Sequence, residues 1–140
     1  MLPARFFALV LLGIAAGLPA RAAIGDDLPA LRTAYGSAKQ VGGQMLFRHG
    51  GFDIAVYFDG TRSAMEIFAL ASRNDKPDEP PKTEFTQKDI DGILALEGQG
   101  QPWNSVQARS GEPTWVRADG KLIARFNPNE KILAVLVNTQ

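Results

Sequence analysis

The chain has 140 residues, with 15 basic and 15 acidic side chains, one histidine, no cysteine and 45% hydrophobic residues. This length fits one hydrophobic core and is too short for two. Balanced charge argues against a nucleic-acid binder, which needs a surplus of Lys and Arg to neutralise phosphates, and the lack of cysteine excludes disulfides, thiolate metal sites and Cys nucleophiles.

The first 22 residues have the features of a secretory signal peptide. Arg5 precedes an uncharged apolar run at 6–18, and Ala20-Arg21-Ala22 has the small-x-small pattern of a cleavage site. The run is shorter than the roughly 20 apolar residues that span a membrane. We therefore expect a signal peptide at 1–22, a single α+β domain at 23–140, and a periplasmic or secreted protein with no stable membrane insertion after cleavage. Removing Arg5 and Arg21 lowers the basic residues from 15 to 13 against 15 acidic ones, a net charge of −2.

A first helix is predicted after the aspartates at 26–27. Leu28, Leu31 and Tyr35 form one apolar stripe at helical spacing, and Gly36 can take the left-handed conformation that closes a helix. The pattern indicates a short helix of about ten residues with a Tyr-Gly end.

Three strands are expected next, at 45–49, 52–58 and 64–70. The second one alternates most clearly, with apolar side chains at Phe52, Ile54, Val56 and Phe58. Gly50-Gly51 and Asp59-Gly60 are turn sequences. The third run is apolar except for Glu66, so the pattern does not assign its faces. Residues 73–82 contain three prolines, mixed charge and no apolar side chain, which predicts an exposed loop, either a binding loop or a solvated connection.

A second helix is predicted from the N-cap Thr86 to the terminator Gly98, with Asp89 at the capping-box position. Strands are expected at 114–118, 122–126 and 132–137, with a weaker one at 105–108. Turn sequences join them at 119–120 and 127–129.

These elements predict an α+β fold. We expect an antiparallel sheet of about six or seven strands with two short helices packed on one face, built as two helix-plus-meander repeats, and with the other face partly open. Superposing Phe58 on Phe126 places Val56 on Ala124, Met65 on Leu133 and Ile67 on Val135.

No catalytic set is evident. His49 is the one imidazole, whereas zinc sites draw on several His or Cys ligands. No serine lies in a G-x-S-x-G elbow, and the glycines do not have phosphate-binding spacing. Asp89 and Asp91 are two residues apart on a helix and point to different sides. We predict no catalytic residue, no metal site and no cofactor, and an enzyme is the less favoured interpretation.

Aromatic and basic side chains are the candidate binding residues. Trp103 and Trp115 either fill the core where the second helix meets the sheet or include an anchor for a partner. Basic side chains and a tyrosine on the strands form either a solvated face or an aromatic-basic patch on the open sheet face. The candidate interaction surface consists of Arg48, Tyr57, Trp103, Arg117 and Arg125.

Several motifs carry a resemblance. The hairpin at 48–60, the acidic helix at 86–98, Trp103 and the W-V-R-A-D-G at 115–120 resemble a group of small exported bacterial proteins of uncharacterised activity, which share F-x-G-F-x-V-x-V-x-F-x-x-G and W-x-R-x-D-G motifs. The order of elements is similar to the tandem helix-plus-meander fold of the β-lactamase inhibitor proteins and of the small outer-membrane assembly lipoprotein. The resemblance implies a fold and no established activity, and this chain lacks the lipidated Cys and the disulfides of those proteins.

Two functions therefore stay open. The first is an exported, non-enzymatic protein-interaction or envelope accessory module whose partner is another envelope protein and not a nucleic acid. The alternative is a small-molecule-binding protein or enzyme with a pocket between helices and sheet. A flat face with an exposed Trp would favour the first, and a cleft lined by convergent polar groups would favour the second. A purely structural domain is a third interpretation, and the sequence does not indicate the oligomeric state.

Overall fold

The computed structural model describes residues 23–71 and 82–139. The predicted signal peptide at 1–22 and nearly all of the predicted loop at 73–82 lie outside these residues. In chain order the described elements are α2 (Leu28–Tyr35), β1 (Ala38–Val41), β2 (Gln44–His49), β3 (Phe52–Asp59), β4 (Arg62–Leu70), α3 (Gln87–Gly98), β5 (Trp103–Val106), β6 (Thr114–Arg117), β7 (Leu122–Asn127) and β8 (Ile132–Val137).

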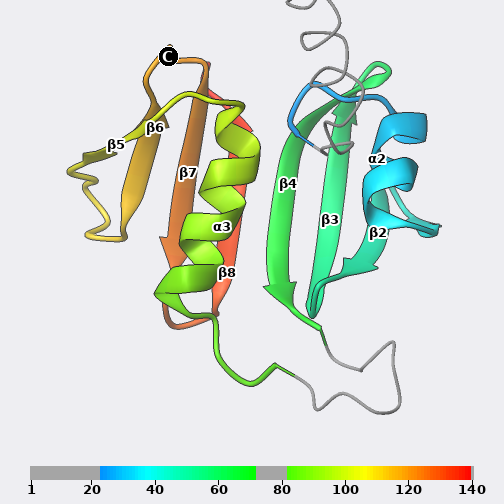
Figure 1. The fold of residues 1–140 in the computed structure, drawn as a ribbon, viewed down its shortest axis with the longest axis horizontal. Helices are drawn as coiled ribbons and strands as arrows, with labels where there is room; N and C mark the ends of the chain where they lie inside the picture. The colour runs from blue at the N-terminus through cyan, green and yellow to red at the C-terminus, as the bar shows by residue number, and fades with distance from the viewer. Residues whose placement is uncertain (1–22, 72–81, 140) are drawn as a thin grey trace, which may run out of the picture.

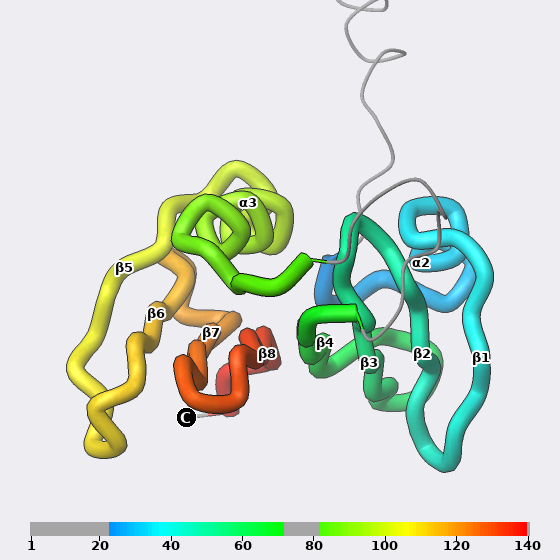
Figure 2. Tube along the Cα trace, turned by 90° about the horizontal axis from the view of Figure 1, so that it is seen from below, coloured from blue at the N-terminus to red at the C-terminus, as the bar shows by residue number. Residues whose placement is uncertain are grey.

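The strands form one antiparallel sheet in the order β1-β2-β3-β4-β8-β7-β6-β5. Strands β4 and β8 meet at its centre, where Glu66 lies opposite Val135. Both helices lie on the same face, α2 over the strands of the first half and α3 over β7 and β8 (Figures 1 and 2). The α+β class and the antiparallel sheet are thus confirmed.

Within the described residues the sheet has eight strands, so the predicted six or seven was wrong. The additional strand is β1, whose four residues are mostly exposed. Its sequence lacks the alternation of apolar and polar residues that indicates a half-buried strand. In the second half, β5 begins at Trp103, two residues before the weak strand predicted at 105–108.

The helix ends follow from local hydrogen bonds. The Asp27 side chain caps α2 by accepting from the Ala30 amide at 3.0 Å, and Gly36 closes it with a φ of 97°. At α3, the Thr86 side chain accepts from the Asp89 amide at 3.1 Å, and the Asp89 carboxylate accepts from the Thr86 amide at 2.9 Å. The predicted capping box is therefore present. Gly98, predicted as the terminator, is instead the last helical residue, and the left-handed residue after it is Gln99.

The core fills the space between the helices and the sheet. It is one cluster that includes Leu31 from α2, Phe47 from β2, Leu94 from α3 and Leu133 from β8. Because β3 and β7 alternate, their buried side chains all point toward the helices, and these are Phe52, Ile54, Val56, Leu122, Ala124 and Phe126.

One part of the predicted superposition is wrong. Leu133 and Val135 are buried on the helix face, whereas Met65 and Ile67 alternate with the buried Glu66 and lie on the opposite face. The cause is a difference in length between the two hairpins. Residues 128–131 connect β7 to β8 but only 60–61 connect β3 to β4, and the β3–β4 register shifts between Tyr57 and Phe58.

Candidate functional site

Three of the five candidate interaction residues lie on the sheet face away from the helices, here called the open face. Arg48 is opposite Asp53 on the neighbouring strand, and its Nε donates to the Asp53 Oδ1 at 2.7 Å. Tyr57 is 36% exposed, and Arg125 is exposed on β7. These side chains are where the strand alternation placed them.

The other two candidates lie on the helix side, so the five residues do not form one surface. The Trp103 Nε1 donates to the Leu94 carbonyl of α3 at 2.6 Å. Arg117 was expected on the open face, but it is only 8% exposed, and its Nη1 donates to the Glu97 carbonyl at 3.1 Å. The reason is register. Trp103 pairs with Arg117, and Trp115, two residues before Arg117, pairs with the buried Ala124, so all of them share the helix face.

Arg117 serves as a link between the sheet and the end of α3. Besides the Glu97 carbonyl it binds the Asp119 carboxylate with two donors, at 3.0 and 2.7 Å. These hydrogen bonds hold the pKa of the Asp119 carboxyl well below its usual range. Trp103 and Trp115 both pack against the core, which supports the core interpretation of the two tryptophans.

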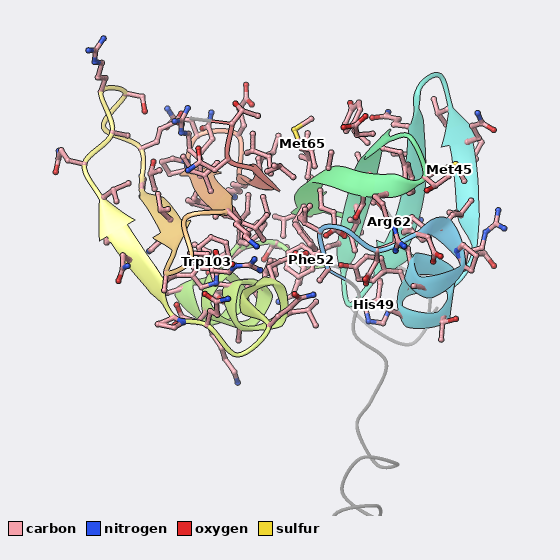
Figure 3. The ribbon with its side chains drawn as sticks, turned by 90° about the horizontal axis from the view of Figure 1, so that it is seen from above. Met45, His49, Phe52, Arg62, Met65 and Trp103 are labelled. Carbon is pink, nitrogen blue, oxygen red and sulfur yellow. The ribbon has the colours of Figure 1, made fainter. Side chains whose placement is uncertain are left out.

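The centre of the open face is apolar. One row of cross-strand neighbours runs through Leu46, Ala55, Ile67 and Ala134. The next row runs through Tyr57, Met65, Leu136 and Ile123. Tyr57 is exposed, and the other side chains of the two rows are partly exposed. In Figure 3, Met65 projects on the side of the sheet opposite the helices, and Trp103 lies on the helix side.

The rim of the open face is polar. Lys39 lies beside Leu46 at the β1 edge of the first row. On the other side of its apolar part, Ala134 is followed by Arg125, and the row then continues through Thr114 to Val106. Arg48 and Asp53 lie in the row that continues through Ala69 to Ile132. An apolar centre with a charged rim is typical of a surface that contacts another protein.

The helix side holds a second feature, which sequence reasoning missed: a buried pair of carboxyl groups. Glu66 of β4 and Glu97 of α3 are both fully buried and are close enough to shift each other's pKa. The Tyr35 hydroxyl donates to the Glu66 Oε1 at 3.0 Å, and the Ile24 amide donates to the Glu97 Oε2 at 2.9 Å. A signal was present, because each glutamate occupies an apolar position, one in a strand and one on the stripe of a helix.

The electrostatics of this pair follow from burial. Desolvation raises the pKa of both Glu66 and Glu97, and for Glu97 the neighbouring Glu66 raises it further. Burial also raises the pKa of Tyr35, with the negative charge of the two carboxyls adding to the effect. The remaining oxygens, Glu66 Oε2 and Glu97 Oε1, have no donor unless a proton is held between the carboxyls. Neither carboxyl group reaches the surface of the described residues.

A pocket of about 450 Å³ lies between the two helices, above β3 and β4. Its apolar lining includes Phe52, Ile54, Phe68, Ile93 and Leu96. Several of its polar groups are already engaged: Lys82 donates to Asp89 at 2.9 Å, and Thr86 belongs to the capping box. His49 packs against the Tyr35 ring, with 5.7 Å between ring centroids. The pocket therefore offers few polar groups to orient a ligand.

Within 23–71 and 82–139, no three His, Asp or Glu side chains gather in a way that would hold a metal ion. Neither helix of that part of the chain has the length and apolar character needed to cross a membrane. No family model, curated protein or solved structure matches the chain.

Proposed function

We propose that this protein is an exported, non-enzymatic interaction module that binds another envelope protein through the open face of its sheet. The observation that carries the proposal is the continuous apolar centre of that face, from Ala55 and Tyr57 across Met65 and Ile67 to Leu136. A monomer gains nothing from keeping such a surface in contact with water, and apolar patches of this kind mark contact sites.

The rim indicates what the partner offers. Lys39 and Arg125 are exposed cations on either side of the apolar part of one row, so a partner with an apolar centre flanked by two acidic groups is complementary. Both tryptophans point away from this face. Affinity therefore depends on aliphatic side chains and on Tyr57, which suits a moderate and reversible complex.

We also propose that the fold is built as two helix-plus-meander repeats, as expected for the resemblance noted above. The order of elements is one helix and four strands, followed by another helix and four strands. Ile54 and Leu122, Val56 and Ala124 are buried pairs at matching positions of β3 and β7. A two-fold relation between the halves makes the central strands β4 and β8 equivalent, and the pairing of Glu66 with Val135 is consistent with an axis at that point.

The interaction is tested by crosslinking from defined positions. A photoreactive residue placed at Ile67, at the centre of the open face, should give a discrete crosslink to one envelope protein in the exporting cell. The same residue at Asp91, exposed on α3, serves as the matched control and should not give that product. The partner identified in this way should bind the purified protein, and R125E should weaken binding without altering the unfolding midpoint, because Arg125 is exposed. Equal crosslinking from both positions would contradict the proposal.

The pocket between the helices supports a second candidate, a small-molecule-binding protein. Gly92 lines this pocket, and a Cβ at that position meets no atom within 4 Å. G92L therefore fills the pocket while leaving the helix intact. If the protein acts through a small ligand, G92L should abolish ligand binding and leave the crosslink from Ile67 unchanged. If it acts through the open face, G92L should have no effect on the partner.

A further inference from the structure

Ala23, the residue that follows the predicted cleavage site, is held in place and is only 1% exposed. Its carbonyl accepts hydrogen bonds from the Asp26 amide at 3.1 Å and from the Ser63 hydroxyl at 3.2 Å. Its own nitrogen donates to the Asp26 Oδ2 at 2.9 Å. The first residues of an exported domain are usually poorly ordered unless they are tied down, and here this segment is docked on the start of β4.

Three carboxyl groups surround this segment. Asp26 accepts a hydrogen bond from the Ala23 nitrogen, Glu97 accepts one from the Ile24 nitrogen at 2.9 Å, and Glu66 lies next to Glu97. The negative charges of the three groups repel one another, and the charge of Asp26 raises the pKa of both glutamates.

In the part of the chain that the structure describes, no Lys or Arg side chain pairs with any of the three carboxyls. Two guanidinium groups bind backbone carbonyls of the same region instead, Arg62 that of Gly25 and Arg117 that of Glu97. The Tyr35 hydroxyl also belongs to this site and donates to Glu66. Two buried acids beside a third, partly exposed one are costly to ionise without a counter-charge, because burial removes the water that would stabilise the charges.

We propose that hydrolysis of the bond between Ala22 and Ala23 creates an α-ammonium group that pairs with Asp26 and supplies the missing positive charge at this acidic cluster. The inference rests on the export part of the proposed function. The step balances with water alone: the Ala22–Ala23 peptide bond breaks, water adds its oxygen to the Ala22 carbonyl carbon to give a carboxylate, and both water protons go to the Ala23 nitrogen, which becomes –NH₃⁺. Processing by the export peptidase thus completes a partly buried ion pair.

The geometry suits this role. The Ala23 nitrogen is already within hydrogen-bond distance of the Asp26 carboxylate. The backbone from the Ala23 nitrogen to the Ile24 nitrogen spans roughly 3.6 Å at most, so the ammonium lies within roughly 6.5 Å of the Glu97 Oε2. At that distance it stabilises negative charge on the glutamate pair. A peptide nitrogen at the same place carries no charge and does not provide this compensation.

The test begins with the full chain, exported with its own N-terminal 22 residues and purified after processing. Protein sequencing should identify Ala23 as the first residue, and any other start overturns the proposal. The pKa of the α-amino group is then measured from the pH dependence of the Ala23 methyl ¹³C resonance, in native protein and in urea. The native value should exceed the urea value, about 8, by about one unit or more, because an opposite charge stabilises the ammonium.

Variants separate the ion pair from a general effect of charge. D26N should bring the native pKa back toward the urea value. D27N changes the same charge one residue away, and its asparagine still caps α2, so it should leave the raised pKa in place. A native value equal to the urea value in the unmodified protein overturns the ion pair even if D26N fails to fold, as does an unchanged pKa in folded D26N. These results are independent of the crosslink from Ile67, so failure of the interaction proposal is recognised separately.

Discussion

At the scale of single residues, the buried glutamates are the least expected part of the molecule. Glu97 continues the apolar stripe of α3 and Glu66 interrupts an apolar strand, yet both are fully buried. Each accepts one donor from outside the pair, Ile24 for Glu97 and Tyr35 for Glu66. A proton held between them would satisfy the two remaining oxygens, and because burial raises the pKa of both carboxyls, we expect the stability of the fold to depend on pH.

E97Q should make stability less dependent on pH. Because the pKa of Glu97 is raised in the folded state, the native protein binds more protons than the unfolded chain above about pH 4.3, and its stability falls as pH rises toward the raised value. Gln presents the same shape with a permanent donor. We expect E97Q to be more stable than the unmodified protein at pH 8 by about 1–3 kcal/mol, the cost of unsatisfied buried oxygens, and the two to converge near pH 4.

Urea unfolding across this pH range measures the difference, with E130Q, at an exposed position, as the control. Parallel pH profiles for E97Q and the unmodified protein would contradict the shared proton.

Phe126 and its neighbour Arg125 test the assignment of the two sheet faces. Phe126 is 8% exposed and packs against the Phe85 ring at a centroid distance of 5.2 Å. F126A should therefore cost about 3–5 kcal/mol. R125S should cost within about 0.5 kcal/mol, because the side chain points to the open face. The comparison is made by urea unfolding at constant m-value, and a large cost for R125S would mean that the open face is already covered.

At the scale of elements, two glycines of α3 have opposite roles. A Cβ added to Gly92 would lie in open space, whereas a Cβ on Gly98 would lie 3.1 Å from the Trp103 Nε1. That nitrogen donates to the Leu94 carbonyl, so crowding there disturbs the contact between α3 and β5.

G92A should stabilise the protein by about 0.5–1 kcal/mol, because alanine has the higher helix propensity. G98A, which makes the same change in the same helix, should be destabilising or neutral, because the Trp103 indole must move. Thermal unfolding with calorimetry measures both. Equal stabilisation by the two substitutions would show that Gly98 does not set the position of Trp103.

Sequence alone predicted the elements that have a local signal. The structure confirms the capping box at Thr86 and the alternation from Phe52 to Val56. It also confirms the turn at Gly50-Gly51, where both glycines have a positive φ. Strand β1 has no such signal, because it is a short and mostly exposed edge strand. The sheet face on which Arg117 lies depends on how β6 aligns with β5 and β7. The sequence of β6 alone does not determine that alignment. The carboxyl pair requires that α3 packs against β4, a contact between segments about 30 residues apart.

At the scale of the whole molecule, the two halves share one core and one sheet. Phe47 of the first half and Leu133 of the second belong to the same cluster. If 23–140 is a single domain, as predicted, unfolding of one half exposes the core side chains of the other half to water, so we expect the two halves to unfold together.

F47A tests this cooperation between the halves. Phe47 is 2% exposed, so its truncation should cost about 3–5 kcal/mol. Both tryptophans lie in the second half, at 103 and 115. Their fluorescence should nevertheless report the same lowered midpoint as far-UV circular dichroism, since one transition is expected from one core. A tryptophan transition that F47A leaves unchanged would show that the halves unfold separately.

The central strand pair also determines how the chain reaches this structure. Most strand pairs of the sheet are hairpins between consecutive strands, but β4 pairs with β8, and Glu66 and Val135 are 69 residues apart in the sequence. Contacts this distant in sequence form slowly, because a long loop must close first. β8 is the last of the described strands to be synthesised, so the edge of β4 stays unpaired while the strands between the two are made. Nascent chains in this state are prone to edge-to-edge association, and we expect a holding chaperone to act at this stage, when the hairpins exist and the central pair does not.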